Sequence, residues 1–252
     1  MDTGIENRVA VVTGGSGAIG GAIARGLADE GATVIITYHS DEAGANAVVA
    51  KIAERGGRAA AMPLDQSDPA AVAASASGIR AEWGDVGILV ANAVEWPDRT
   101  ADELASLARS LDVNLLGTVR VVDAVLPGMR AAGWGRIVLV STDIVEQPMA
   151  GSLSYPVAKG ALETASRVLA VREAAAGILT NVVRPGFTLT DRALESPFMG
   201  QRVVDAEAAR TPTGRICTPE DVASAVLYLA SAANGHVNGQ VLSVAGGREL
   251  VR

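Results

Sequence analysis

Residues 9–21 read VAVVTGGSGAIGG, and this stretch decides the fold. Its first five residues form a continuous run of β-branched and small side chains, which is typical of a strand buried on both faces of a sheet. The glycines allow a tight turn, after which Ile19, Ile23 and Leu27 recur every four residues, as on one face of a helix. A buried strand, a glycine-rich turn and a helix in this order favour a phosphate-binding site, because backbone N–H groups lie open where the helix begins. A turn with packing duties alone is the alternative interpretation.

The rest of the chain repeats this alternation of short apolar runs and longer helical patterns. We expect a helix at 41–55, and strands at 8–13, 33–38, 58–64, 88–91, 137–141, 180–184 and 240–244. Such repetition, with strands that lack apolar–polar alternation, predicts an α/β fold: a doubly wound, seven-stranded parallel sheet with helices on both faces, of the Rossmann type. Ligands bind these sheets beyond the carboxyl ends of the strands. We find no linker or repeat, so we predict a single dinucleotide-binding and catalytic domain over residues 1–252.

The composition narrows the class of protein. The 252 residues are 49% hydrophobic and 19% charged, which is enough to bury a large core. A net charge of −7 without a basic run argues against nucleic acid as a partner. The one cysteine, Cys217, rules out a disulfide within the chain and suits a reducing compartment. We find neither a membrane span nor a signal peptide in the sequence, and we expect a cytoplasmic protein without a membrane partner.

Tyr155 and Lys159 carry the second chemical signal. They lie four residues apart, which places both side chains on the same face of a helix. A phenol titrates near pKa 10, and a neighbouring ammonium group lowers that pKa because it stabilises the phenolate. Lys159 is one of only two lysines among the 21 basic residues, and a lysine retained in so arginine-rich a chain favours a functional role. The pair predicts acid–base chemistry on a carbonyl oxygen, whereas a surface tyrosine beside a solvated lysine is the alternative.

Taken together, the motifs resemble those of the short-chain dehydrogenase/reductase family over nearly the whole chain. The matching elements, in order and spacing, are a TGxxxAxG turn from residue 13, Asn92-Ala93, Asn114, the YxxxK pair at 155–159, PGFTLT at 185–190 and GQVLSVAGG at 239–247. The resemblance implies a ketone reductase, or the reverse alcohol dehydrogenase, in which hydride comes from a nicotinamide cofactor.

The resemblance also implies the catalytic roles. Tyr155 exchanges the proton, Lys159 lowers the phenol pKa and binds the nicotinamide ribose, and Asn114 holds a water in a relay from Lys159 to solvent. A hydroxyl thirteen residues before the tyrosine orients the carbonyl. That position is Thr142 rather than the family's serine, and the neighbouring Ser141 is the second choice. No metal is expected.

The second predicted strand ends without a carboxylate, which bears on the choice of cofactor. An acidic residue there would hold a ribose 2′-hydroxyl and repel a 2′-phosphate, so its absence favours NADP(H), with NAD(H) as the alternative. His39 is either a phosphate donor or a solvated loop histidine. The predicted cofactor-binding residues are Gly14, Ser16, Gly17, Ala18, Ile19, Gly20, Thr37, Tyr38, His39, Ser40, Asp65, Asn92, Ala93, Tyr155, Lys159, Pro185, Gly186, Thr188 and Thr190.

The segment around 191–213 is expected, from the resemblance, to cover a small-molecule substrate. Its apolar side chains suggest a hydrophobic cyclic or polyketide-type ketone, and a 3-ketoacyl group is the other main candidate. The predicted substrate-binding residues are Met149, Leu153, Phe187, Leu194 and Phe198.

The resemblance further implies a homotetramer that pairs the helices carrying Asn114 and Tyr155. Candidate interface residues on the second of these helices are Ala161, Leu162, Ala165 and Leu169, and a place in the core is the alternative for them. Val94 and Val145 stand where the family has glycine. These departures, with those at positions 91 and 142, motivate a competing hypothesis, a nucleotide-binding regulatory or scaffolding protein with weakened catalysis.

Overall fold

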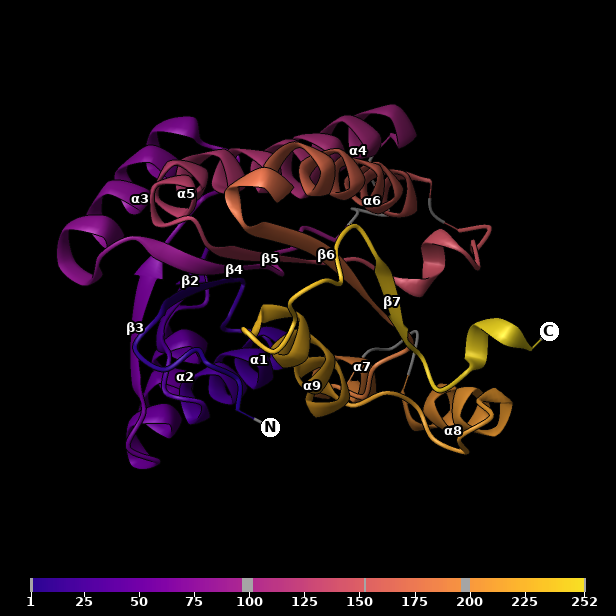
Figure 1. Cartoon of the computed structure of the whole chain (residues 1–252). Coiled ribbons are helices and arrows are strands. Elements are labelled where there is room, and N and C mark those ends of the chain that lie inside the picture. The colour runs from indigo at the N-terminus through magenta and orange to yellow at the C-terminus, as the bar shows by residue number, and fades with distance from the viewer. Residues whose placement is uncertain (1, 97–101, 152, 196–199, 252) are drawn as a thin grey trace.

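A parallel sheet of seven strands forms the centre of the protein (Figure 1). The computed structural model describes residues 2–96, 102–151, 153–195 and 200–251. The strand order is β3-β2-β1-β4-β5-β6-β7, and every neighbouring pair is parallel. The predicted fold class is therefore confirmed, and each predicted strand agrees with the observed one to within two residues at either end. The strands are β1 (Val9–Thr13), β2 (Thr33–Tyr38), β3 (Arg58–Pro63), β4 (Val86–Ala91), β5 (Gly135–Val140), β6 (Ile178–Pro185) and β7 (Val241–Val244).

Helices cover both faces of this sheet, as Figure 1 shows. One face packs against α1 (Ala18–Asp29), α2 (Glu42–Glu54) and α9 (Pro219–Ala230). The other packs against α3 (Pro69–Trp83), α5 (Thr118–Ala132) and α6 (Ser154–Glu173), while the remaining helices are α4 (Glu103–Ser110), α7 (Asp191–Glu195) and α8 (Gly200–Arg210). Among the described residues, no helix is both long and apolar enough to cross a membrane.

Two hydrophobic clusters, one on each face, hold the layers together. Ile23 and Leu27 of α1 are fully buried against the sheet, which explains their four-residue spacing. Burying a side chain of this size contributes about 1.5–3 kcal/mol. On the other face, Leu162 and Leu169 of α6 lie in the core, so these two are not the surface residues that a helix–helix interface would need.

The order of the strands reverses between β1 and β4, and this reversal positions the site. The chain runs outward from β1 to β2 and β3, then returns to add β4 on the other side of β1. Connections on either side of such a point leave the sheet in opposite directions, so a crevice opens at the carboxyl ends of the two central strands.

The path from α4 to α5 contains a π-helical segment, Leu111–Gly117. A π turn takes one residue more than an α turn, and such segments are frequent at functional sites. Asn114 lies in this segment and is completely buried. Its amide donates to the Glu95 carbonyl oxygen at 2.9 Å and accepts from the Glu95 N–H at 2.8 Å. The irregular helix thereby fixes the backbone that follows β4.

Candidate active site

The glycine-rich turn after β1 leaves no room for a side chain at several of its positions, Gly14 and Gly20 among them. Gly14 has φ of +64°, and a Cβ there would come within 2.8 Å of the Ala93 Cα. A Cβ on Gly20 would come within 2.4 Å of the Gly14 carbonyl oxygen. By contrast, a Cβ on Gly17 would meet nothing closer than 3.6 Å, and this N-cap offers α1 no side-chain hydrogen bond. The first N–H groups of α1 therefore remain open for a phosphate group, as a dinucleotide requires.

Hydrogen bonds lock the ends of β1 and β4 together beneath this turn. The Thr13 hydroxyl oxygen accepts from the N–H groups of Asn92 and Ala93, both at 3.0 Å. In return, the Asn92 amide donates to the carbonyl oxygens of Thr13 and Gly14, both at 3.1 Å. These bonds leave little freedom at the carboxyl ends of the central strands, so the crevice is formed before any ligand arrives.

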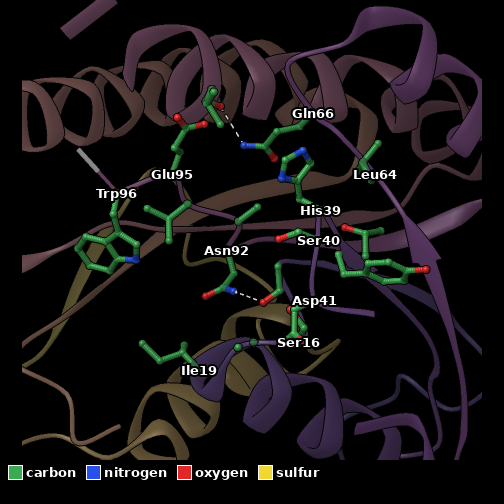
Figure 2. Close-up of a pocket in the computed structure, with 18 of the residues that line it drawn as sticks. Ser16, Ile19, His39, Ser40, Asp41, Leu64, Gln66, Asn92, Glu95 and Trp96 are labelled. Atoms are coloured by element: carbon green, nitrogen blue, oxygen red, sulfur yellow. Dashed lines mark hydrogen bonds between the residues drawn. The ribbon is translucent and has the colours of Figure 1, made fainter. Parts of the chain in front are cut away.

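A cavity of about 860 Å³ occupies this crevice. In Figure 2, Ser16 and Ile19 lie on one side of it, Glu95 on the opposite side, and Asn92 between them. Most of the predicted cofactor-binding residues line the cavity: Gly14, Ser16, Gly17, Ala18, Ile19, Gly20, Thr37, Tyr38, His39, Ser40, Asp65, Asn92, Ala93 and Thr190. Its lining does not include Tyr155, Lys159, Pro185, Gly186 or Thr188.

Carboxylates stand at the far end of the cavity, beyond β2. The His39 ring lies 3.8 Å from the Asp65 carboxylate, and hydrogen bonds from Ser67 lower the pKa of Asp65. Asp41, which the sequence interpretation did not consider, also lines the cavity. Its carboxylate accepts from the Gly44 N–H at 2.9 Å and so caps α2. The last residues of β2 carry no negative charge, but these nearby carboxylates do, and their charge disfavours a 2′-phosphate.

Tyr155 and Lys159 lie on one face of α6, as their spacing predicts, but the expected effect on the phenol is absent. Burial raises the pKa of Tyr155, a hydrogen bond with Thr142 opposes that rise, and Asp143 adds to it. Lys159 is 2% exposed, and burial lowers its pKa to about 8. Its Nζ donates to the Val140 carbonyl oxygen at 2.8 Å and lies 6.0 Å from the centre of the Tyr155 ring. Lys159 is not among the groups that shift the phenol pKa, and its ammonium group is held by the backbone of β5, so the structure does not show the expected lowering and the role of Lys159 stays a prediction.

The two candidate hydroxyls point to different partners. The Thr142 hydroxyl lies close enough to the Tyr155 phenol to lower its pKa, and it donates to the Asp143 carboxylate at 3.4 Å, whereas the Ser141 hydroxyl donates to the Glu163 carboxylate at 2.6 Å. Both partners belong to α6: Tyr155 lies in its first turn and Glu163 two turns further along. This geometry favours Thr142 for contact with a substrate.

Two side chains near the phenol were not identified from the sequence. The indole ring of Trp96 lies against the Tyr155 ring, with centroids 5.0 Å apart and planes inclined by 38°. Trp96 is 48% exposed and lines the cavity, so it forms a wall between the cavity and the phenol. Asp143 follows Thr142, and burial raises the pKa of its carboxyl group. The sequence does carry a signal for Trp96, since it is a large aromatic residue a few positions after β4, at the end of the sheet where ligands bind.

The predicted substrate-binding residues are not brought together in the cavity. Met149, Leu153 and Leu194 are exposed, Phe187 is half-buried, and none of the four lines the cavity. Phe198 lies outside the described residues. Val94 does line the cavity, as expected for a residue that replaces a family glycine.

Comparison with known proteins agrees with this geometry. A family model described as enoyl-(acyl carrier protein) reductase matches residues 14–249. The chain is 38% identical to cis-4-hydroxycyclohexanecarboxylate dehydrogenase of Sinomonas cyclohexanicum, with 100% of both chains covered. It is 36% identical to the 3-oxoacyl-(acyl-carrier-protein) reductase FabG of Salmonella typhimurium, over 98% of this chain and 99% of the relative.

A solved structure from Beutenbergia cavernae with bound NADP superposes with a TM-score of 0.87, at 33% identity over 98% of this chain and 99% of that one. The chain belongs to the short-chain dehydrogenase/reductase family. As a short-chain dehydrogenase/reductase, it is an NAD(P)-dependent oxidoreductase that acts on CH–OH or C=O groups of a small-molecule substrate. Within the described ranges, no group of three His, Cys, Asp or Glu side chains is arranged to hold a metal ion.

Proposed function

We propose that this enzyme is an NADP(H)-dependent carbonyl reductase for hydrophobic cyclic ketones, with Tyr155 as the proton donor. The observation that carries the proposal is the convergence of the Thr142 hydroxyl and the Tyr155 phenol beside the nucleotide cavity. A ketone oxygen placed there accepts hydrogen bonds from both groups. Thr142 orients the carbonyl, and Tyr155 donates the proton.

Burial of the phenol favours reduction over oxidation. Because the pKa of Tyr155 is raised, the phenol keeps its proton at neutral pH, and that is the form that donates to a ketone oxygen. Lys159, with a pKa of about 8, is a proton source that operates close to neutral pH. We assign it the task of restoring the phenol proton, with Asn114 completing the path to solvent.

The nucleotide cavity fits a dinucleotide, which supplies hydride when bound. The glycine turn would hold the pyrophosphate, Asp65 the adenine end, and Thr190 the nicotinamide end, where Lys159 would meet the ribose. We favour NADP(H) over NAD(H) because Thr37 and Tyr38 place no carboxylate at the end of β2. His39 and Ser40 are exposed there as donors to a 2′-phosphate. The Asp41 carboxylate opposes this preference and accepts a hydrogen bond within α2.

Trp96 supports a cyclic substrate. An exposed indole beside the catalytic phenol offers a flat apolar surface, against which a ring packs better than a flexible acyl chain does. The cyclohexane ring named for the Sinomonas cyclohexanicum relative is consistent with this choice. A 3-ketoacyl thioester, named for the Salmonella typhimurium relative, is the second candidate.

A substrate panel tests the proposal directly. NADPH oxidation is followed with 1-decalone, acetoacetyl-N-acetylcysteamine and crotonyl-N-acetylcysteamine, and we expect the highest kcat/KM for 1-decalone. Trp96→Ala should raise KM for 1-decalone about tenfold through lost apolar contact, and affect the acetoacetyl thioester less. Tyr155→Phe should lower kcat for either ketone at least 10²-fold. Unchanged turnover in Tyr155→Phe, or reduction of the crotonyl thioester alone, would refute the assignment.

Other sequence predictions continue as proposals. They are the single domain, the cytoplasmic location, a cover formed by residues 191–213, and the homotetramer. For the tetramer, the exposed apolar side chains of α6 are Val157, Val168 and Val171 rather than the buried leucines of the same helix.

A further inference from the structure

The end of β5 is tied to α6 at two points already described. The Val140 carbonyl oxygen accepts from Lys159, and the Thr142 hydroxyl lies beside the Tyr155 phenol. Ser141 lies between these two attachments and is 4% exposed. Its hydroxyl is the group that the mechanism does not use.

Ser141 makes a third attachment to the same helix. Its Oγ donates to Glu163 Oε1 at 2.6 Å, a short hydrogen bond to a charged acceptor. Glu163 stands one turn beyond Lys159, which itself stands one turn beyond Tyr155. Three consecutive residues of the β5 end therefore meet three successive turns of α6. We call these three contacts the β5–α6 ladder.

A buried arginine of β6 anchors the ladder and the segment that follows it. Arg184 donates to both oxygens of Glu163, at 3.1 Å from Nε and 2.7 Å from Nη2. The same guanidinium also binds the carboxylate of Glu146. Residues 142–145 are thus held at both ends by one ion-pair cluster, through Ser141 on one side and Glu146 on the other.

We propose that Ser141 is a positioning residue for the reaction: its bond to Glu163 holds the end of β5 in register with α6, and so keeps the Thr142 hydroxyl on the Tyr155 phenol. The inference rests on the roles proposed for those two residues. Without the Ser141 bond, the middle attachment of the ladder is lost while both flanking contacts keep their chemical groups. A displacement of the hydroxyl by about 1 Å is enough to reduce turnover as much as 10²-fold.

Ser141→Ala is the primary test because it leaves Glu163 paired with Arg184 and exposes no unpaired buried charge. With NADPH and 1-decalone, we expect kcat to fall about tenfold and the KM for NADPH to stay unchanged. Ser141→Thr keeps a hydroxyl and should restore most of the rate. Thr142→Val should cost more, about 10²-fold.

The double variant Ser141→Ala/Thr142→Val separates positioning from other effects. If Ser141 acts through Thr142, the double variant should be no slower than Thr142→Val alone. Ser166→Ala is the matched control, since Ser166 is equally buried on α6 and donates to the Glu163 carbonyl oxygen at 2.7 Å. It should lower stability and leave kcat unchanged.

Three results would overturn the positioning role: additive losses in the double variant, an equal loss of kcat in Ser166→Ala, or a larger loss for Ser141→Ala than for Thr142→Val. The last result would make Ser141 the hydroxyl that contacts substrate. If no ketone of the panel is reduced, the proposed function fails on its substrate. The ladder is then tested by crystal structures, in which Ser141→Ala should displace the Thr142 hydroxyl from Tyr155 and Ser166→Ala should not.

Discussion

Lys159 makes the stability of the protein depend on pH in a way that can be measured without a substrate. Its ammonium group is buried, with one hydrogen bond to the Val140 carbonyl oxygen. Burial lowers the pKa from the ordinary value of 10.5 to about 8. The perturbation is Lys159→Met, which keeps the length and the apolar contacts of the side chain and removes the titrating group.

The magnitude follows from the two pKa values. Between pH 8 and 10.5 the unfolded chain still holds a proton on this lysine that the folded chain has released. The free energy of unfolding therefore rises with pH in that window. One pKa unit corresponds to about 1.4 kcal/mol, so the wild type should gain roughly 2.5 kcal/mol between pH 7 and pH 10 relative to Lys159→Met. Tyr155 is present in both proteins, and its own titration largely cancels in the difference.

Urea unfolding at pH 7, 8, 9 and 10, without nucleotide, measures this difference. Lys51→Met is the matched control, because it removes the other lysine of the chain, which is exposed on α2. The difference between the wild type and that control should not change with pH. If the difference in unfolding free energy between the wild type and Lys159→Met did not change with pH, the reasoning would be refuted. Such a result would mean that burial does not penalise the charge of this lysine.

Two further predictions concern the nucleotide cavity. Gly20→Ala should weaken NADPH binding at least tenfold, measured by fluorescence titration, because its Cβ would lie 2.4 Å from the Gly14 carbonyl oxygen. Gly26→Ala is the control on the same helix, because a Cβ there meets nothing within 4 Å. This variant should bind NADPH normally, and its free energy of unfolding should be about 0.5–1 kcal/mol higher than that of the wild type. Asp41→Asn should raise the kcat/KM ratio of NADPH over NADH about fivefold, since a repulsion of about 1 kcal/mol is removed while asparagine still caps α2. Asp68→Asn, a similar cap on α3, should leave that ratio unchanged, and an equal change in both variants would exclude a specific role for Asp41.

The parts of the fold that were predictable rest on local patterns. The continuous apolar run before Gly14 identifies a strand buried on both faces, and the four-residue spacing of Tyr155 and Lys159 identifies a shared helical face. Both patterns need only neighbours in the chain. The hydrogen-bond acceptor of the Lys159 ammonium group could not be predicted, because it is a backbone carbonyl of β5 and only packing brings that strand end next to α6.

The same limit applies to the charges around the site. Nothing near Glu163 in the sequence indicates that its partner is Arg184, which lies 21 residues away on strand β6. Asp41 was missed for a different reason, since the charge was sought on β2 itself and not at the start of the next helix. Local patterns thus identify the reacting groups, whereas the contacts that tune them come from long-range packing.

The length of the π-helical segment at 111–117 determines which way the side chains of α4 point relative to the rest of the site. Arg109 on α4 grips the Glu95 carboxylate with two bonds of 2.7 Å, while Asn114 holds the Glu95 backbone. Each helical residue turns the chain by about 100°, so a one-residue deletion within 111–117 would rotate Arg109 away from Glu95. Substitutions that preserve length would leave this orientation intact. The position of Glu95 therefore depends on the number of residues in the segment as well as on Asn114 within it.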